Sequence, residues 1–476
     1  MENIESLEKQ QHAGSRVHGK TGDGQSFNGW ITHFTGDSIV FEVCAPLQVL
    51  RVTEVIPEFH ASIEGKSVYS GRAVIRGFVD EGVSQRCAAS IQSGWNGGLS
   101  LNDVGQLSGL EEDCRSFLKH WSDSCQILPE FKLLIADMRM LLQQFRLWLD
   151  KLELGLAGIP ATDRAKAERH LVTQLATSFI PTFNHLFEKF EIIAAAIPSE
   201  RTRFHHAYVK QQLHPLLLCS PFAWRTFTKP LGYAGDYEMV NMILNDALAG
   251  ETLFARVLNA WFISQPPAEA HRNRINVLTE TIEKEALRAS RSGRMMKVLN
   301  LGCGPAIEIQ RLIERSPLCE AIDFTLLDFN DETIAYTRQI LDDRRQVGHR
   351  RLSINFIKKS VMQLLKGGER GGLGENYDFI YCAGLYDYLP DRVCRQLNSI
   401  YYGLLAPDGL LMTTNVDACN PIRHMLDYVL EWHLIYRNAG QFRPLAPAEA
   451  PAEAVKIYAD ITGVNIFMEV RRPQND

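Results

Sequence analysis

The sequence predicts an α/β protein whose C-terminal part forms a doubly wound parallel sheet, preceded by a helical region and a small N-terminal β-barrel. Three patterns in the 476 residues predict this arrangement. Short strand-like runs extend to about residue 100, apolar stripes with helical spacing follow to about residue 265, and strand and helix alternate from Lys297 onward. We therefore expect three domains, at residues 1–100, 101–265 and 266–476.

The first region has the pattern of a small antiparallel barrel. Its strand-like runs are Phe27–Ile31, Ser38–Val43, Val49–Val52 and Ser70–Ile75. Turn residues separate these runs, at Gly22–Gly24, Gly36–Asp37 and Glu64–Gly65. Short strands at this spacing are typical of a barrel. We place its end at the glycine-rich stretch Ser93–Gly98.

Two long apolar stripes define the helical region. They run through Phe131–Leu154 and Ala165–Ile193 with i, i+3, i+4 spacing. We favour core packing of a helical bundle, and an acyl-chain groove or a dimer face is the alternative. Pro266–Pro267 then marks a hinge, and Asn273–Ala289 is expected to form a helix that leads into the sheet.

Composition and charge exclude several classes of protein. Lys and Arg total 50 against 56 Asp and Glu, and this net charge of -6 argues against nucleic acid as a partner. No run of about 18 apolar residues predicts a transmembrane segment, and Met1–Gln11 lacks the apolar core of a secretory signal. The ten cysteines form no Cys-x-x-Cys pair, so we expect reduced thiols, a cytoplasmic location and no metal site.

The segment with the most chemistry is Val298–Ala306, an apolar strand that runs into Gly302-Cys303-Gly304 and then into a helix. Glycines let a backbone turn sharply and approach a ligand, and a helix N-terminus favours an anionic group. A second buried strand ends at Asp328, whose carboxylate can accept both hydroxyls of a ribose. Together they predict a nucleoside-containing cofactor; a tight structural turn and a surface Asp are the alternative.

Two further features refine the prediction. Ile307 stands where a dinucleotide fingerprint needs its third glycine, which favours S-adenosylmethionine over NAD or FAD. Further strands are expected at Leu352–Ile357, Tyr377–Gly384, Leu410–Asn415, Lys456–Asp460 and Val464–Val470, which makes seven in all. Residues that follow the carboxyl ends of such strands face the ligand crevice, and Asn415 is one of them. The predicted cofactor-binding residues are Asn300, Gly302, Cys303, Gly304, Asp328, Phe329, Ser360, Val361, Cys382 and Gly384.

Residues 297–476 resemble class I S-adenosylmethionine-dependent methyltransferases. The glycine loop, the acid after the second strand and the order of the elements match, whereas Asn300 replaces the acid that usually opens the glycine motif and Ala306 replaces its third glycine. The resemblance implies a Rossmann-like seven-stranded methyltransferase sheet and methyl transfer from S-adenosylmethionine.

Four strings extend the resemblance to about residues 115–476. They are Lys229–Tyr237, Arg272–Arg274, Gly384–Leu389 and Glu431–Arg437. With them the chain resembles bacterial proteins of 3-hydroxypalmitic acid methyl ester biosynthesis, which make a quorum-signalling factor. This implies methylation of the carboxylate of a hydroxy fatty acid, with a small-molecule acid as the substrate. The alternatives are a methyltransferase for the N or O atom of another natural-product intermediate, and a nucleotide-messenger sensor with a non-catalytic methyltransferase-like domain.

The barrel faintly resembles a PilZ domain but departs from the motif that binds cyclic di-GMP. Lys20 follows Arg16 where that motif has a second Arg, and Gly36-Asp37-Ser38 lacks its second part. A packing or dimer role without a nucleotide is therefore the interpretation we favour, and a homodimer stays an open alternative.

Catalysis on a carboxylate needs positioning and exclusion of water more than a base. Arg274 can hold a carboxylate in a bidentate pair, either that of the acceptor or that of the cofactor. Tyr233 and Tyr386 are further catalytic candidates, and His424 is a weak base for an acceptor hydroxyl, amine or thiol. The predicted substrate-facing residues are Asp236, Tyr237, Arg272, Tyr388, Trp432 and Tyr436.

Two segments are expected to cover the site. Tyr233–Tyr237 reads as a lid over the cofactor, with Asp236 as an N-cap in the alternative interpretation. A helix over Pro421–Arg437 would bring His424, Tyr428, Trp432 and Tyr436 to one face, which either covers the acceptor or is a plain core stripe.

Overall fold

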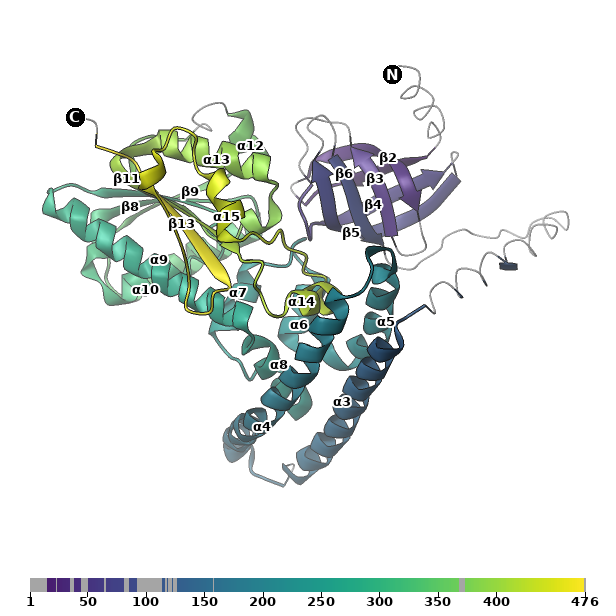
Figure 1. Ribbon diagram of the computed structural model, residues 1–476. Helices are drawn as coiled ribbons and strands as arrows, with labels where there is room; N and C mark the ends of the chain where they lie inside the picture. Colours follow the sequence, from purple (N-terminus) through teal and green to yellow (C-terminus); the bar gives the residue numbers. More distant parts are fainter. Residues whose placement is uncertain are drawn as a thin grey trace, which may run out of the picture.

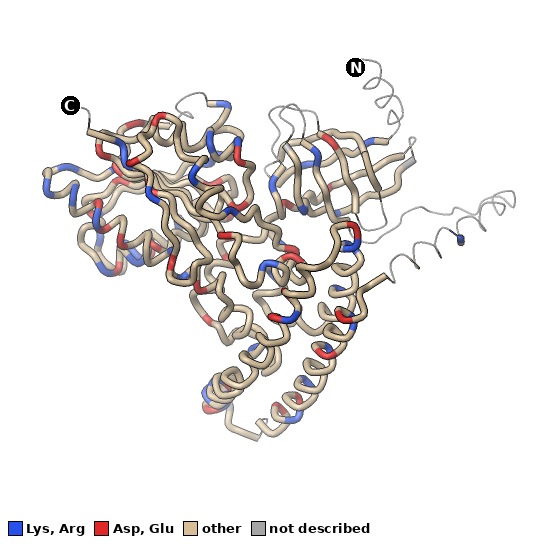
Figure 2. The backbone as a smooth tube through the Cα atoms, viewed as in Figure 1, with Lys and Arg blue, Asp and Glu red and all other residues tan. Residues whose placement is uncertain are grey.

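The computed structural model describes residues 15–22, 24–34, 38–43, 50–63, 66–80, 85–91 and 126–474 except 157 and 368–372, together with positions 114, 115, 118 and 122. These residues form a β-barrel, a group of long helices and a sheet covered by helices on both faces (Figure 1). Basic and acidic positions are interspersed along all three parts in the view of Figure 2. None of the helices within this described part is long and apolar enough to cross a membrane.

The barrel is closed and antiparallel, with strand order β1-β2-β3-β6-β5-β4. Alternate side chains point inward, and the rings of Phe27, Phe41 and Phe59 meet in its core with centroids 5.5–6.4 Å apart. The strands are β1 (Arg16–Lys20), β2 (Ser26–Phe34), β3 (Ser38–Val43), β4 (Val55–Ile63), β5 (Lys66–Asp80) and β6 (Gln85–Ile91). The predicted barrel is therefore confirmed, while its expected end at Ser93–Gly98 and the turns at Gly36–Asp37 and Glu64–Gly65 lie outside the described residues.

The prediction of a strand at Val49–Val52 is wrong, because the described residues 50–52 form no strand. Its described part belongs to a turn that ends where β4 begins at Val55, and Thr53 has a positive φ of 62°. Two contacts hold this turn: the Thr53 amide donates to the Ile75 carbonyl (2.7 Å), and the Glu54 carboxylate accepts from the Arg51 amide (3.0 Å). The residues have strand-like composition, but bonds to distant positions decide their conformation.

The helical region packs its two apolar stripes against each other. Leu134, Met138 and Leu142 of one stripe and Phe183 and Phe187 of the other are buried in one cluster, which confirms core packing. A short helix from near the C-terminus, α14 (Arg423–Leu430), joins this cluster. The helices of the region are α3 (Pro129–Leu156), α4 (Ala161–Ala195), α5 (Ser199–Leu217), α6 (Pro221–Thr228), α7 (Tyr237–Leu244) and α8 (Leu253–Ile263).

The sheet has seven strands in the order β12-β13-β11-β10-β7-β8-β9, and β13 is antiparallel to both of its neighbours. This is the seven-stranded, doubly wound, Rossmann-like sheet that the sequence predicts. The order reverses between β7 and β10, so the crevice at their carboxyl ends is where such a sheet places a ligand. The strands are β7 (Met296–Leu301), β8 (Ile322–Asp328), β9 (Ser353–Lys358), β10 (Tyr377–Cys382), β11 (Leu405–Val416), β12 (Val455–Ala459) and β13 (Asn465–Arg471).

Helices cover both faces of the sheet (Figure 1). One face packs on α9 (Pro266–Arg291), α10 (Ile307–Arg315) and α11 (Asp331–Val347), and the other on α12 (Val361–Lys366) and α13 (Asp391–Leu404). The remaining short helices are Pro317–Ala321, Tyr386–Tyr388, α15 (Ala439–Phe442), Arg443–Leu445 and Ala452–Ala454.

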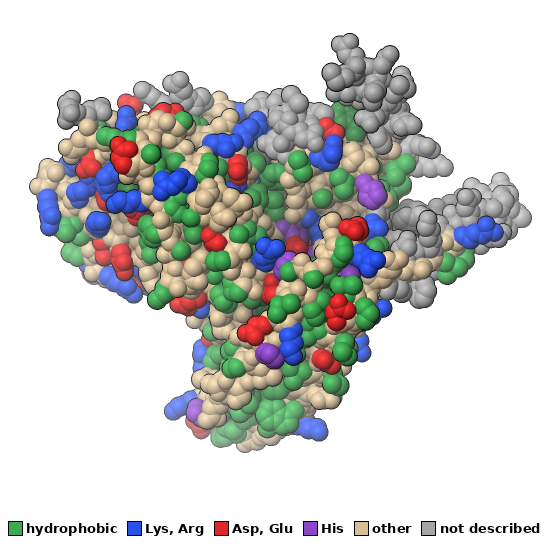
Figure 3. All heavy atoms as spheres, in the orientation of Figure 1, with side chains coloured by type: hydrophobic (Ala, Val, Ile, Leu, Met, Phe, Trp, Pro, Cys, Tyr) green, Lys and Arg blue, Asp and Glu red, His purple; other side chains and the backbone are tan. Residues whose placement is uncertain are grey.

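Three polar contacts join the described part of the barrel to the helical region. The Val55 amide donates to the Gly232 carbonyl (2.7 Å), Arg72 donates to the Thr228 carbonyl (2.8 Å), and Arg76 donates to Nδ1 of His206 (2.8 Å). Figure 3 shows histidine, basic and acidic side chains gathered near this junction. The barrel is thus attached next to the segment that follows α6.

Candidate active site

Two cavities meet at the carboxyl edge of β7, β8 and β10. We name them by a buried charged residue in each: the Arg274 cavity and the Asp328 cavity. Both are lined by Gly302 and Gly304 of the glycine loop and by Gly384 after β10. The predicted glycine loop therefore lies at the meeting point of the two cavities.

The glycine loop is held against β8. The amides of Gly302 and Cys303 both donate to the Leu327 carbonyl, at 2.9 and 3.0 Å. Gly302 and Gly304 adopt φ values of 70° and 49°, which a glycine reaches without strain. Ala306 has a positive φ of 49° at the N-terminus of α10, although it carries a side chain.

Asp328 lies directly beside the glycine loop. Its Oδ2 accepts from the Gly304 amide (3.4 Å) and its Oδ1 from the Asn330 amide (3.0 Å). Burial raises the pKa of this carboxyl, and the backbone donors and the Arg51 guanidinium oppose that shift. Tyr233, Phe329, Ser360 and Val361, which the sequence also predicts for the site, line the cavity around it as well.

Aromatic side chains form one side of the Asp328 cavity. The ring centroids of Tyr233 and Phe329 are 5.3 Å apart, and the Tyr233 hydroxyl lies 3.5 Å from Oγ1 of Thr333. Tyr237 also lines the cavity, and its hydroxyl donates to Glu332 (2.9 Å). The expected lid segment is thus placed over this cavity by contacts with α11.

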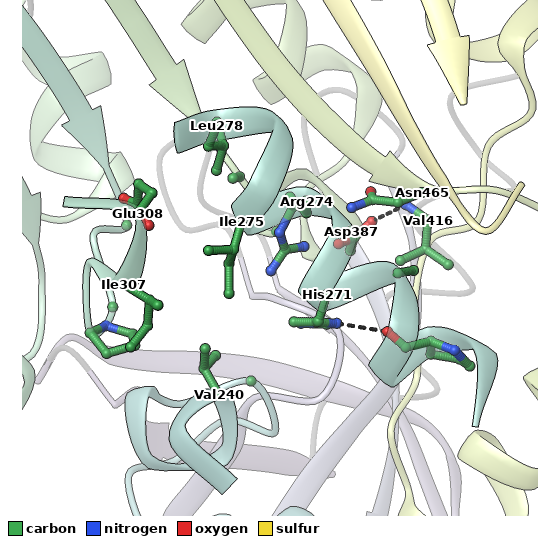
Figure 4. A pocket seen from close by; sticks show the side chains of 18 of the residues that line it. Val240, His271, Arg274, Ile275, Leu278, Ile307, Glu308, Asp387, Val416 and Asn465 are labelled. Atoms are coloured by element: carbon green, nitrogen blue, oxygen red, sulfur yellow. Dashed lines mark hydrogen bonds between the residues drawn. The ribbon is translucent and has the colours of Figure 1, made fainter. Parts of the chain in front are cut away.

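Arg274 is buried, and its guanidinium faces the cavity. It is 8% exposed, and it forms no ion pair or hydrogen bond with any other residue that the structure describes. Figure 4 shows it pointing into the cavity with Glu308 on one side and Asp387 on the other. A Cβ on Gly384 would lie 3.1 Å from its Nη1, so the glycine makes room for the guanidinium.

Two buried carboxyl groups share this cavity without pairing with Arg274. Glu308 accepts from the Tyr381 hydroxyl (2.6 Å) and from Nδ2 of Asn300 (3.5 Å), and Asp387 accepts from the Val416 amide (2.6 Å). Burial raises the pKa of both groups. The cavity therefore presents separated positive and negative groups to whatever enters it.

His271 lies one helical turn before Arg274 and also lines the cavity. Its Nδ1 donates to the Pro267 carbonyl (3.0 Å), which leaves Nε2 as the atom with a free lone pair (Figure 4). Burial, together with the charge of Arg274, lowers the pKa of His271 to about 3. The imidazole is consequently neutral at physiological pH.

An apolar cavity adjoins the Arg274 cavity. The two share Pro267, His271, Leu426 and Trp432 as lining residues. The other residues that line it come from the helical region, from α9 and from α14 with its N-cap: Phe222, Ile243, Phe262, Gln265, Ala268, Ile422, Met425 and Leu430. Trp432 stands where the cavities meet and donates to the Tyr388 hydroxyl (2.8 Å).

No protein-family model matches the chain, and no curated protein does. Among solved structures, it is similar to a possible exported protein from Bordetella parapertussis (15% identity, TM-score 0.40, covering 63% of this chain and 97% of that one). It is also similar to magnesium protoporphyrin IX methyltransferase from Synechocystis PCC 6803 with bound SAH (13% identity, TM-score 0.31, covering 43% of this chain and 84% of that one). A third similar structure is the N-methyltransferase NodS from Bradyrhizobium japonicum (16% identity, TM-score 0.30, covering 50% of this chain and 98% of that one). The assignment of the site depends on its own geometry.

Tyr386, Cys382 and Arg272 are among the predicted residues that the structure places away from the cavities. The Tyr386 hydroxyl donates to Asn398 of α13 (2.7 Å), and the Cys382 side chain lies in the core between the sheet and α13. Cys382 points away because alternate residues of β10 face opposite sides and Tyr381 takes the cavity side. Arg272 donates to the Ile243 and Ile263 carbonyls at the ends of α7 and α8, so its role is that of a helix C-cap.

Asp236 is likewise structural. It accepts from the Met239 amide (2.8 Å) as the N-cap of α7 and pairs with Arg225 (2.9 Å). The capping interpretation of this residue is the one that its contacts support.

The expected helix over Pro421–Arg437 is only partly present. It ends at Leu430, because Glu431 takes a left-handed conformation (φ 48°) and the Trp432 amide returns to the Leu426 carbonyl (2.9 Å). The predicted common face is therefore wrong. Trp432 reaches the cavity, whereas His424 lines none of the cavities described above and Tyr436 packs against Ala270, Val416 and Val464.

Sequence reasoning missed several residues that line the cavities, among them Arg51, His271, Glu308 and Tyr381. Two of them carried a local signal. Glu308 is in the first turn of the helix after the glycine loop, and His271 is one turn from Arg274. Arg51 carried none, because only the docking of the barrel brings it to the site.

Proposed function

We propose that this protein transfers a methyl group from S-adenosylmethionine to the carboxylate of a hydroxy fatty acid and forms a methyl ester. The observation that carries the proposal is the buried Arg274 without an ion-pair partner among the described residues, placed between the glycine loop and an apolar cavity. A buried charge without a partner is costly, so a site that keeps one is built for an ion of opposite charge.

The residues around the glycine loop fit the cofactor. Asp328 has the position and the acceptor atoms for two ribose hydroxyls, and Phe329, Ser360 and Val361 surround the space next to it for a purine. Glu308, supported by Asn300 and Tyr381, can accept from the ammonium of a methionyl group in place of the acid that the glycine motif lacks. When bound, S-adenosylmethionine supplies an electrophilic methyl group that a carboxylate oxygen can attack without a base.

Arg274 and the apolar cavity fit the acceptor. The guanidinium can bind a carboxylate in bidentate geometry and orient one oxygen toward the meeting point of the two cavities. The first carbon atoms of an alkyl chain attached to that carboxylate would face the adjoining apolar cavity lined by Phe262, Met425 and Leu430. The burial of this site excludes water, which strengthens the ion pair.

The test is product analysis with methyl-labelled S-adenosylmethionine. The full chain is supplied with 3-hydroxy fatty acids of several lengths, plain fatty acids, amino acids and short acids, and mass spectrometry detects the label. We expect a labelled methyl ester of a long hydroxy acid. Arg274→Gln should lower kcat/KM for that acid at least about 100-fold, because one buried carboxylate pair is worth roughly 3–5 kcal/mol.

Arg291→Gln is the matched control, since Arg291 is an exposed arginine of the same helix. Its kinetics should equal those of the wild type. Binding of the cofactor without ester formation from any of the acids would overturn the proposed acceptor.

His271 favours a second candidate, methylation of a hydroxyl or amine. Its neutral Nε2 in the Arg274 cavity can accept a hydrogen bond from such an acceptor and orient it, while its pKa of about 3 makes it a weak base. Label on an ether or an amine, lost in His271→Gln but not in Arg274→Gln, would select this candidate.

A further inference from the structure

The barrel contributes residues to a cavity in the sheet domain. Arg51, Val52 and Glu54, all from the turn before β4, line the Asp328 cavity together with Phe329 and Ser360. Val52 is buried, and the Arg51 side chain is 16% exposed. One wall of the proposed nucleoside site therefore comes from a different part of the chain than the glycine loop.

The turn that carries these residues is held in one conformation. Thr53 keeps a left-handed φ of 62°, which β-branched residues rarely adopt and which strained functional segments often show. Hydrogen bonds join it to β5 on both sides, from Thr53 to Ile75 (2.7 Å) and from Ile75 back to Glu54 (2.9 Å). The buried Glu54 carboxylate also accepts from the Gly22 amide (3.3 Å).

Arg51 projects from this turn onto Phe329. Its guanidinium carbon lies 4.6 Å from the centre of the ring, and one of its nitrogens lies 3.5 Å from Glu54. Tyr233 contacts the same ring, so Phe329 has a barrel residue and a lid residue as neighbours. The positive charge of Arg51 also acts on the buried Asp328.

The barrel holds the lid as well. The Val55 amide bonds to the Gly232 carbonyl, directly before Tyr233, and Arg72 bonds to the Thr228 carbonyl at the end of α6. The first residue of β4, which directly follows the Arg51 turn, thus also holds the lid segment in place. Barrel and lid close the Asp328 cavity from two sides.

We propose that the N-terminal barrel supplies Arg51 as a cofactor-binding residue and closes the nucleoside side of the methyltransferase site. The proposal rests on the proposed function, because it needs a nucleoside in the Asp328 cavity. A planar guanidinium can stack on a purine and donate to its nitrogen atoms. The barrel is then a part of the binding site and not a separate module.

The test is calorimetric titration of the full chain with S-adenosylhomocysteine and with adenosine. We expect Arg51→Ala to raise the Kd of both ligands by the same factor, about tenfold or more, and Arg51→Lys to restore part of the affinity. Arg16→Ala, an exposed arginine of β1, is the matched control and should bind both ligands as the wild type does.

Hydrogen exchange provides a second readout that does not depend on a variant. Bound S-adenosylhomocysteine should slow exchange at residues 50–56 of the wild type. Binding by the wild type, with an unchanged Kd in Arg51→Ala and unchanged exchange at residues 50–56, overturns this inference and leaves the proposed function intact. Failure of the wild type to bind either ligand overturns the proposed function itself.

Discussion

Single residues of this site depend closely on their neighbours. Gly384 shows it best, because the space that its missing side chain leaves is filled by the Arg274 guanidinium. The same glycine has a φ of 89°, a conformation that side chains disfavour. Both the backbone conformation and the neighbouring Arg274 guanidinium therefore require glycine at position 384.

We expect Gly384→Ala to displace Arg274 and to lower the unfolding free energy by about 1–3 kcal/mol, the cost of a strained φ. Urea denaturation and the KM for the acid measure the two effects. Gly403→Ala is the control, because a Cβ added to this helical glycine would meet no atom within 4 Å and its φ is not positive. Alanine there should stabilise the protein by about 0.5–1 kcal/mol.

Asp328→Asn should weaken the binding of S-adenosylhomocysteine. An amide keeps the size of the side chain but replaces one acceptor by a donor, so a buried ribose hydrogen bond of about 1–3 kcal/mol is lost. This corresponds to a Kd about 10–100 times higher in a titration. An unchanged Kd would remove Asp328 from the ribose site.

At the scale of single residues, the sequence predicts those site residues whose position depends on their neighbours in the chain. The glycine loop and Asp328 are recognisable because their neighbours in the chain make the strand, the turn and the helix start. Arg51 and Trp432 could not be placed in this way, since bonds between distant segments decide where they lie. Arg272 and Arg274 are only two positions apart, yet helical geometry turns one to carbonyl groups and the other to the cavity.

At the scale of elements, α14 is held at both ends by charged groups from other helices. Glu191 of α4 accepts from the His424 and Met425 amides at its start (3.0 and 2.7 Å). At its end, Glu431 pairs with Lys210 of α5 (2.8 Å), and the Lys229 ammonium donates to the Leu430 carbonyl (3.3 Å). The predicted helix continued past Leu430 because its apolar spacing continues, and only these partners show where it ends.

The start of α14 gives the stability a pH dependence. Burial raises the pKa of Glu191 from 4.5 to about 7, although two amides and Arg423 oppose the shift. The folded chain therefore keeps this proton longer than the unfolded chain, so stability present below about pH 4.5 is lost as the pH rises through 7.

We expect Glu191→Gln to remove this dependence. Between pH 5 and 8 the Tm of the wild type should fall relative to that of the variant. Glu188→Gln, an exposed position of the same helix, should follow the wild type. Parallel curves for the wild type and Glu191→Gln would contradict the assignment.

The end of α14 depends on Glu431. Burial alone would raise its pKa, but Lys210 and Lys229 hold it well below the usual range. Glu431→Gln should lower the unfolding free energy by about 3–5 kcal/mol, because Lys210 loses its ion-pair partner and the buried Lys229 loses a nearby negative charge. Denaturant titration measures this loss, with the exposed Glu453→Gln as the control.

At the scale of the whole molecule, the barrel and the sheet domain meet around one segment between α6 and α7. The sequence predicts both bodies, because strand spacing and strand–helix alternation are local patterns. Their contact could not be predicted, since it depends on interactions between distant segments such as that of the Arg51 guanidinium with the Phe329 ring. The apolar cavity behind Arg274 is similar, because α14 arrives there from near the C-terminus.

The order of synthesis gives the barrel turn a consequence for folding. Arg51 is made long before Phe329 and Gly384, and at about 5–20 residues per second roughly 15–60 s separate the last barrel strand from β10. The barrel is made before the sheet domain, so Arg51 leaves the ribosome before the Phe329 ring on which it lies. A nascent chain that stops before β10 lacks Gly384, Leu385 and Tyr388 of the Asp328 cavity, so retention of S-adenosylhomocysteine by a stalled chain would report that the sheet has formed as far as β10.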